Sequence, residues 1–155
     1  MPIQDTQEFI IELEKQGELK RVKAEVDPDL EIAEILRREM YSNGPAILFE
    51  NVKGHTMPVL GNAFGSMKRL EIGLEMTDFT EIGQRITDMT KMDMPSGLLN
   101  KIKKLPELSK MTASFPKSES SGLVTEITST DASFDDLPII KSWPNDAGRF
   151  ITLGL

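Results

Sequence analysis

The sequence predicts an α/β domain followed by the first strands of a β domain, which these 155 residues do not complete. Two observations lead to this prediction. Before about residue 111, short apolar runs alternate with amphipathic helical patterns, which is typical of an α/β layer structure. After residue 122 the helical period is absent, and the sequence stops on an apolar run whose backbone needs a neighbouring strand.

We therefore expect three parts in the chain. Residues 1–111 form an N-terminal α/β domain, residues 112–122 form a polar linker rich in Ser, Pro and Gly, and residues 123–155 begin the β domain. An apolar strand is predicted at 139–140 and another in the closing run. Their partner strands are expected on sequence beyond residue 155.

The composition excludes several function classes. Lys and Arg total 18 against 25 Asp and Glu, and the formal net charge of −7 argues against a general nucleic-acid or anionic-membrane binder. With no cysteine, disulfides, thiolate nucleophiles and zinc–thiolate sites are excluded. The N-terminus has no signal-peptide pattern, and no apolar run approaches the roughly 20 residues of a membrane span. We expect a cytoplasmic protein.

The first helix is predicted to begin at Asp5 or Thr6 and to end at Gly17. Residues 22–26 then alternate between apolar and charged side chains, which is the period of a half-buried strand. The pair Asp27-Pro28 predicts the start of a second helix, which residues 42–44 end. The apolar residues expected on one face are Phe9, Ile10 and Leu13 in the first helix, and Leu30, Ala33, Leu36 and Met40, facing inward, in the second.

Residues 46–49 are a short apolar run between turn signals, which predicts a central strand covered on both faces. Residues 57–60 predict an edge strand because they contain a proline. Ser66 is expected to cap the next helix, and another begins at Thr77 or Asp78. The apolar members are Leu70, Ile72, Leu74 and Met76 in the first of these, Phe79, Ile82, Ile86 and Met89 in the second, and Leu98, Leu99, Ile102 and Leu105 in a short amphipathic piece.

Three features could carry chemistry, but each has a simpler structural interpretation. Residues 61–66 precede a helix and could bind an anion, yet they lack the spacing and the Lys-Ser/Thr pair of a Walker A loop, so a plain strand-to-helix turn is predicted. His55, the only histidine, is predicted to be a solvated turn residue. Asp131, Asp135 and Asp136 are dense enough for a carboxylate metal site, but we predict that they occupy turns.

Two other features have a favoured structural role. Lys101, Lys103 and Lys104 form a small basic cluster, which we interpret as a solvated helix face. Trp143, the only tryptophan, is predicted to plug a corner between apolar strands. No Ser/His/Asp or Cys/His triad can be assembled.

Several short runs of residues follow one another along the chain in a recognisable order and spacing. Near the C-terminal end they are Leu137-Pro138-Ile139, Trp143-Pro144, Asp146, Gly148, Phe150-Ile151-Thr152 and Gly154. Earlier they are residues 17–22, 25–28, 44–54 and 58–62. Together these runs resemble the UbiD family of decarboxylases, and the resemblance covers nearly the whole chain.

The resemblance implies a carboxy-lyase that reversibly decarboxylates a small aromatic or α,β-unsaturated carboxylic acid with prenylated FMN. In that family the flavin forms a covalent cycloadduct with the substrate double bond beside a glutamate/arginine network, while a divalent metal (Mn or Mg) and potassium help to hold its phosphate. It also implies a split-barrel flavin domain from about residue 123 onward, a homo-oligomer, and a flavin prenyltransferase that supplies the cofactor.

The family's catalytic positions are expected beyond residue 155, so we assign no catalytic residue and no metal ligand to this chain. Thr152 is the one candidate cofactor-binding residue, because its position in the family lies in a strand that passes close to the flavin. We expect the chain alone to bind no flavin.

Three accounts of the function remain open. In the first, the chain is the N-terminal part of a UbiD-like decarboxylase and is inactive without the missing catalytic region. In the second, it is a non-catalytic small subunit or interaction module that pairs with a separate flavin-binding chain. In the third, it is a standalone small-ligand domain with a pocket inside residues 1–111. The unpaired closing strand favours the first account.

Overall fold

The computed structural model describes residues 3–76, 78, 80–90, 118, 120, 122 and 125–152. The chain divides into two compact units. The first comprises Met1–Glu81 together with Ala132–Leu155, and the second comprises Ile82–Asp131. All three strands belong to the first unit, as does every candidate site described below.

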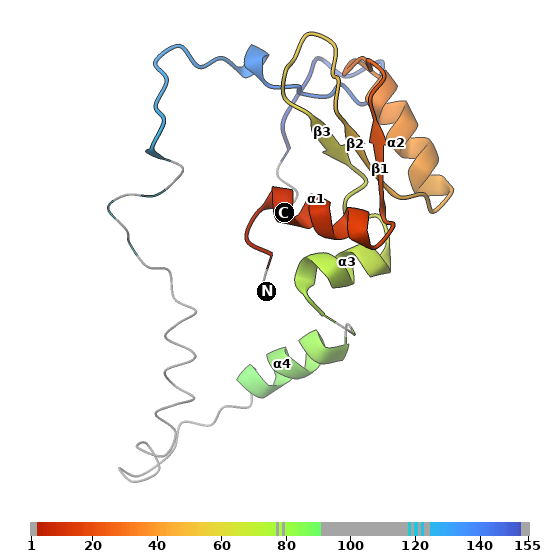
Figure 1. Cartoon of the computed structure of the whole chain (residues 1–155), viewed down its shortest axis with the longest axis vertical. Helices are drawn as coiled ribbons and strands as arrows, with labels where there is room; N and C mark the ends of the chain where they lie inside the picture. Colours follow the sequence, from red (N-terminus) through yellow and green to blue (C-terminus); the bar gives the residue numbers. More distant parts are fainter. Residues whose placement is uncertain are drawn as a thin grey trace. The chain divides into compact units, whose positions relative to one another are not determined.

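A three-stranded sheet forms the centre of the first unit (Figure 1). Its strands are β1 (Leu19–Val22), β2 (Ala46–Phe49) and β3 (Val59–Gly61), in the order β1-β2-β3. β1 and β2 are parallel, and β2 and β3 are antiparallel. The parallel pair requires a crossover, which helix α2 (Glu31–Tyr41) supplies. The predictions of a central strand at 46–49 and of a neighbouring edge strand are confirmed.

The strand predicted at 22–26 is wrong by about three residues. β1 covers Leu19–Val22, because Leu19 pairs with Ala46 and this register continues to Val22 opposite Phe49. Beyond it, Val26 makes only an isolated parallel bridge to Val52. Pairing with the buried strand β2 therefore determines where β1 lies, more than the alternation of apolar and charged side chains in residues 22–26 does.

Helices α1 (Thr6–Lys15) and α3 (Met67–Leu74) begin at the predicted caps. The Asp5 carboxylate accepts a hydrogen bond from Glu8 N, and Ser66 Oγ accepts one from Arg69 N. Helix α4 (Thr80–Thr90) confirms the helix predicted from Thr77 or Asp78, and its Ile86 is exposed. Residues 91–117, which include the predicted piece at 98–105 and the lysines at 101–104, lie outside the described residues, as do Phe79 and the Met89 side chain.

The four residues of β2 are all buried, and successive side chains point to opposite faces of the sheet. On one face, Ile47 and Phe49 pack with Ile32 of α2. On the other face, Ala46 packs with Phe9 and Leu13 of α1. Ile72 of α3 packs against this second cluster, and Figure 1 shows α3 beside α1. The sheet is therefore covered by α2 on one face and by α1 and α3 on the other.

The predicted start and inward face of α2 both need correction. The helix begins at Glu31 rather than at Asp27-Pro28, and the residue that it buries completely is Ile32. Leu36, from the predicted stripe, packs at the edge of the core with Ile35. Met40, expected to face inward, is 53% exposed. The buried face of α2 is therefore centred on Ile32, which packs with Ile47 and Phe49 of β2, and not on the predicted stripe.

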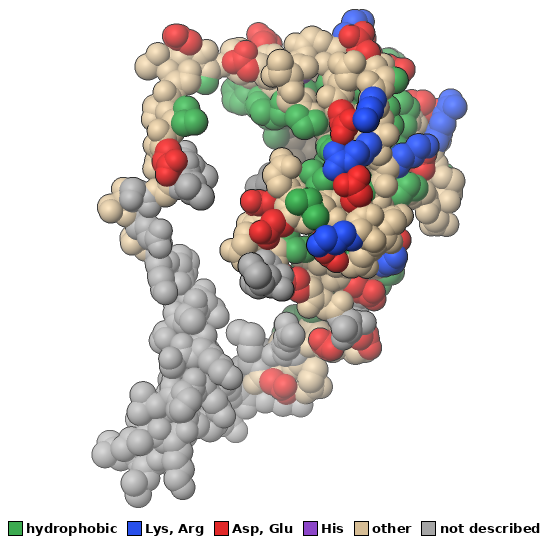
Figure 2. Space-filling model, viewed as in Figure 1, with side chains coloured by type: hydrophobic (Ala, Val, Ile, Leu, Met, Phe, Trp, Pro, Cys, Tyr) green, Lys and Arg blue, Asp and Glu red, His purple; other side chains and the backbone are tan. Residues whose placement is uncertain are grey.

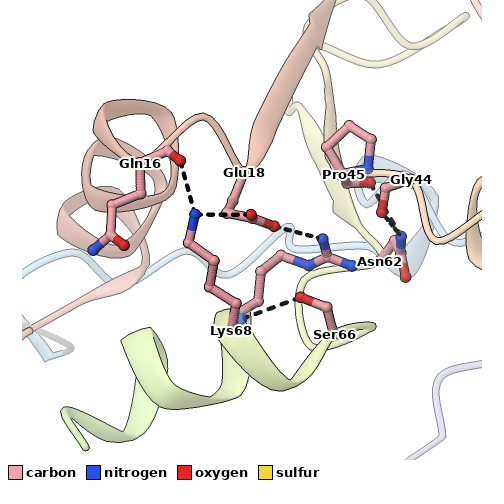
Figure 3. Close-up of polar contacts among 8 residues, drawn as sticks. Gln16, Glu18, Gly44, Pro45, Asn62, Ser66 and Lys68 are labelled. Atoms are coloured by element: carbon pink, nitrogen blue, oxygen red, sulfur yellow. Dashed lines mark hydrogen bonds and ion pairs between the residues drawn. The ribbon is translucent and has the colours of Figure 1, made fainter. Parts of the chain in front are cut away.

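A buried ion pair joins α3 to the start of β1, and the sequence analysis did not foresee it. Arg69 is only 1% exposed, and its Nη1 donates to Glu18 Oε2 at 3.0 Å. Lys68 Nζ lies 3.1 Å from Glu18 Oε1 and donates to Gln16 O (Figure 3). Two further Arg69 donors, Nε and Nη2, have no partner within the described part of the chain. Burial raises the pKa of Glu18, but the hydrogen bonds from Lys68 and Arg69 outweigh it and hold this pKa below the usual 4.5.

Replacing Glu18 by leucine should destabilise the protein by about 3–5 kcal/mol, since it leaves the buried Arg69 charge without its counter-charge. The free energy of unfolding from urea titration measures this loss. In the double variant Glu18→Leu/Arg69→Met much of it should be recovered, because an apolar pair then replaces the ions. The matched control is Glu14→Leu, which breaks the exposed pair with Arg21 and should change stability little. A double variant no more stable than Glu18→Leu would contradict this account.

The contribution of Glu18 should also depend on pH. Its pKa in the folded protein is depressed, so the contribution is complete above the unfolded pKa near 4.5 and is lost as pH falls through the lower folded pKa. The stability difference between the wild type and Glu18→Leu should therefore be constant near neutral pH and shrink below about pH 4.5. Urea titrations at stepped pH test this, and a difference that stays constant into acid would refute it.

Candidate functional site

An apolar groove lies between helix α2 and residues 140–144. Its volume is about 590 Å³, within the range of ligand pockets. The Leu30 side chain lies at its α2 end, and Asn62 and Ser142 add polar atoms. The remaining apolar lining residues are Ala33, Leu36 and Met40 on the α2 side, and Ile140, Trp143 and Pro144 on the other. The predicted inward stripe of α2 thus lines this groove.

Backbone hydrogen bonds attach the second wall of the groove to the turn before α2. Leu30 N donates to Lys141 O at 3.1 Å, and Lys141 N donates to Pro28 O at 3.0 Å. These bonds form an isolated parallel bridge between Asp29 and Lys141. Ile140 packs against the core cluster that contains Ile32. The strand predicted at 139–140 is therefore reduced to one bridge.

The turn that receives Lys141 is strained. Leu30 has φ 68°, and Glu31 N donates across it to Asp29 O at 2.9 Å, which makes a γ-turn. A positive φ at a non-glycine residue costs about 1–3 kcal/mol and persists only where the surroundings enforce it. Here Asp27 Oδ1 accepts from Asp29 N, and Asp27 Oδ2 accepts from Lys53 Nζ at 2.7 Å. These hydrogen bonds stabilise the turn independently of its contact with residue 141.

The charged side chains at the rim of the groove are paired with one another. Glu34 accepts from Arg37 Nε at 2.7 Å and from Arg38 Nε at 2.7 Å, and these bonds lower its pKa to about 2. The Arg37 guanidinium also lies 5.5 Å from the centre of the Tyr41 ring. Figure 2 shows basic and acidic side chains adjoining on the visible face of the molecule rather than forming a field of one sign. The groove therefore offers mainly apolar contact.

Residues 61–66 form the predicted strand-to-helix turn. Asn62 has φ 53°, and its Nδ2 donates to Gly44 O and Pro45 O at 3.1 Å each (Figure 3). Asn62 thereby ties the end of β3 to the chain before β2. A Cβ atom on Gly65 would lie 1.8 Å from Asn62 Oδ1 and 3.0 Å from Arg69 Nη2. The glycine is needed for this close packing, which explains the motif without a phosphate.

The other candidates from the sequence do not gather into a site. His55 is half-buried, and its N–H donates to Val52 O in a turn. Asp136 accepts from Ser133 N in the capping box of a short 3₁₀ helix, η2 (Phe134–Asp136), as predicted for a turn residue. Across the described ranges, no three His, Cys, Asp or Glu side chains lie together as metal ligands.

Two C-terminal candidates lie at the surface. Trp143 is 62% exposed, so the prediction of a corner plug is wrong; without strands on both sides of it there is no corner to fill, and the ring lines the groove instead. Thr152 is exposed and belongs to no strand. Residues 125–152 form no strand, and their single bridge is that of Lys141. No helix in the described ranges has the length and apolar character needed to traverse a membrane.

Two known proteins are similar to nearly the whole chain. It is 44% identical over 153 residues to an uncharacterized protein of Aquifex aeolicus, covering 97% of this chain and 32% of that protein. It is 40% identical over 152 residues to an uncharacterized protein of Archaeoglobus fulgidus, covering 98% and 31%. The chain thus spans about a third of the length of these relatives.

Two solved structures are also similar. One is the open form of vanillic acid decarboxylase from Sedimentibacter hydroxybenzoicus, with 34% identity, a TM-score of 0.48, and coverage of 52% of this chain and 19% of that one. The other is an evolved dimeric form of the UbiD-class enzyme HmfF from Pelotomaculum thermopropionicum in complex with prFMN, with 34% identity, a TM-score of 0.42, and coverage of 45% and 16%.

Two family models match consecutive parts of the chain. Residues 10–86 match the N-terminal domain of 3-octaprenyl-4-hydroxybenzoate carboxy-lyase, and residues 116–155 match the Rift-related domain of the same enzyme family. The two matches occur in order, and one wall of the groove comes from each. The chain belongs to the UbiD family.

Proposed function

We propose that this chain is the N-terminal part of a UbiD-like carboxy-lyase that reversibly decarboxylates aromatic or α,β-unsaturated acids with prenylated FMN. The observation that carries the proposal is the ordered pair of family matches, at residues 10–86 and 116–155. The catalytic region is proposed to lie outside these 155 residues. The boundary between the two domains is proposed at residues 112–122.

The residues of this chain fit the cofactor only in part. Prenylated FMN supplies an electron sink for loss of CO2 when it is bound in the complete enzyme. Thr152 is exposed and is proposed to lie beside the flavin, where its hydroxyl can donate or accept one hydrogen bond. The described residues offer no ligand cluster for the divalent metal that would hold the phosphate. We propose that the residues carrying the catalytic steps lie in the region outside this chain.

The role proposed for this chain is to position the cofactor domain. The backbone of Lys141 is fixed to residues Pro28 and Leu30, and Ile140 packs into the core. The segment that leads to Thr152 therefore starts from a rigid anchor. Correct placement of reacting groups is worth several kcal/mol in enzymes, so such an anchor can affect the rate without touching the substrate.

A second candidate function is a non-catalytic small subunit that pairs with a separate flavin-binding chain. The exposed aromatic side chains of Trp143 and Phe150 are compatible with this candidate, since exposed apolar side chains can form an interface with a separate chain. The two candidates differ only in whether the catalytic region is joined to residue 155 or is supplied by another polypeptide.

The test completes the chain with the part of the Aquifex aeolicus relative that lies outside the match, either fused or added as a separate polypeptide. A flavin prenyltransferase is coexpressed, Mn²⁺ and K⁺ are supplied, and cinnamic and 4-hydroxybenzoic acids serve as probe substrates. We expect bound flavin and CO2 release from the completed protein and neither from the chain alone. The visible absorbance of the purified protein reports bound flavin, and the CO2 released from each acid reports activity.

The pattern of activity then separates the candidates. Activity of the fusion only supports a single polypeptide, whereas equal activity of the separate chains supports a small subunit. A chain that alone binds stoichiometric flavin or releases CO2 would overturn the proposal. So would a completed protein that binds prenylated flavin but leaves every aromatic and unsaturated acid of a broad panel unchanged.

A further inference from the structure

We propose that the apolar groove between α2 and residues 140–144 is the docking site for the remainder of the Rift-related domain, which lies outside these 155 residues. This inference rests on the proposed function and adds to it the surface through which the two family domains are joined. The occupant is polypeptide of that domain, presenting apolar side chains. Four features of the first unit support it.

The first feature is the origin of the two walls. Helix α2 lies within residues 10–86, which match the N-terminal domain, and residues 140–144 lie within 116–155, which match the Rift-related domain. The groove is therefore a seam between the two domains. Since the Rift-related match continues to residue 155 and the relatives are about three times as long as this chain, the rest of that domain is the nearest candidate to fill the seam.

The second feature is the exposure of large apolar side chains. Met40 and Trp143 are 53% and 62% exposed in the groove. Farther along the same segment, Phe150 and Ile151 are also exposed. Large apolar side chains that follow one another along a segment are costly to leave in water, at about 25 cal/mol per Å². Exposed apolar side chains thus occur in the groove and again at residues 150–151 of the same segment.

The third feature is the backbone of the second wall. Lys141 pairs with the turn at Pro28 and Leu30, but the described residues on either side of it make no strand pairing. Backbone beside a bridge that makes no strand pairing can serve as a template for a further segment. The strained γ-turn at Leu30 holds residue 141 in place, so the template is presented by a fixed element and not by a free tail.

The fourth feature is the charge of the rim. Glu34 is engaged by both Arg37 and Arg38, so these charges are satisfied within α2 itself. A phosphate or nucleic-acid ligand would have to compete with Glu34 for the arginines. An apolar protein segment requires no such exchange. With the rim charges already paired, the mainly apolar lining is what the groove offers to an occupant, and this suits a polypeptide segment with apolar side chains.

Cysteine footprinting tests the location of the docking site, because the chain contains no natural cysteine. Met40→Cys places a thiol in the groove, and the matched control Met67→Cys places one on α3, where Met67 is 59% exposed and does not line the groove. Maleimide labelling, read by mass spectrometry of the labelled peptide, is measured for the chain alone and for the chain fused to the remainder of the Aquifex aeolicus relative, without flavin. We expect labelling at residue 40 to slow at least tenfold in the fusion, and labelling at residue 67 to stay unchanged.

A second pair of variants tests the energetics with the two polypeptides added separately. Met40→Lys places a charge in the apolar groove and should weaken association about tenfold or more by isothermal titration, while Met67→Lys should leave it unchanged. Circular dichroism verifies that both variants keep the helix content of the parent chain. The same assay with cinnamic acid alone tests for a small-molecule occupant, and the mass of the chain alone in solution tests for a second copy.

Several results would overturn the inference. Unchanged labelling of residue 40 in the fusion would show that the groove stays open, whether or not the separate polypeptides associate. Equal effects of Met40→Lys and Met67→Lys would place the contact elsewhere, and protection of residue 40 in a dimer of the chain alone, or by cinnamic acid, would assign the groove to another occupant. The labelling experiment contains no flavin, so its result is independent of the activity test. If residue 40 is protected but the completed protein does not decarboxylate any acid, only the proposed function is refuted. If the completed protein decarboxylates an acid but residue 40 is not protected, only this inference is refuted.

Discussion

The fold of the first unit depends on the burial of strand β2 on both faces. Its side chains alternate, so Ile47 and Phe49 require one apolar cover and Ala46 requires another. Helix α2 supplies the first as the crossover of the parallel β1–β2 pair, and α1 with α3 supplies the second. A short apolar run thus determines which helices lie on which side, and the groove lies on the α2 side, between this helix and residues 140–144.

The two covers are fixed by different means. On the α1 and α3 side, the Glu18–Arg69 pair is buried and joins elements far apart in the sequence, so its contribution lies mainly in the penalty for separating the charges. On the α2 side, no ion pair among the described residues enters the core. There the position of the helix depends on the apolar contacts of Ile32 and on the γ-turn at Leu30. The groove side is therefore the more open to an additional apolar contact.

Local signals in the sequence predicted those elements whose determinants are local. The caps at Asp5 and Ser66 and the buried run at 46–49 were correct, because capping atoms and apolar clusters act within a few residues. The predicted start of α2 was wrong because Asp27 N donates to Glu31 Oε2 and Asp29 N donates to Asp27 Oδ1, which makes a turn before the helix. Arg69 gave no signal, since its burial depends on Glu18, which is distant in sequence. The Trp143 prediction failed because it assumed strands on both sides of the ring.

The position of the γ-turn links the fold to the proposed function. Leu30 precedes α2, and its backbone N–H donates a hydrogen bond to the carbonyl oxygen of Lys141. A shift of α2 along its axis would therefore move residue 141, and with it the segment that leads to Thr152. Since backbone bonds and packing of Ile140 define this anchor, substitutions of exposed charges along α2 leave it intact, whereas a change in the packing of Ile32 displaces it. If the proposed function holds, the placement of the cofactor domain depends in this way on a residue of the α2 core, Ile32.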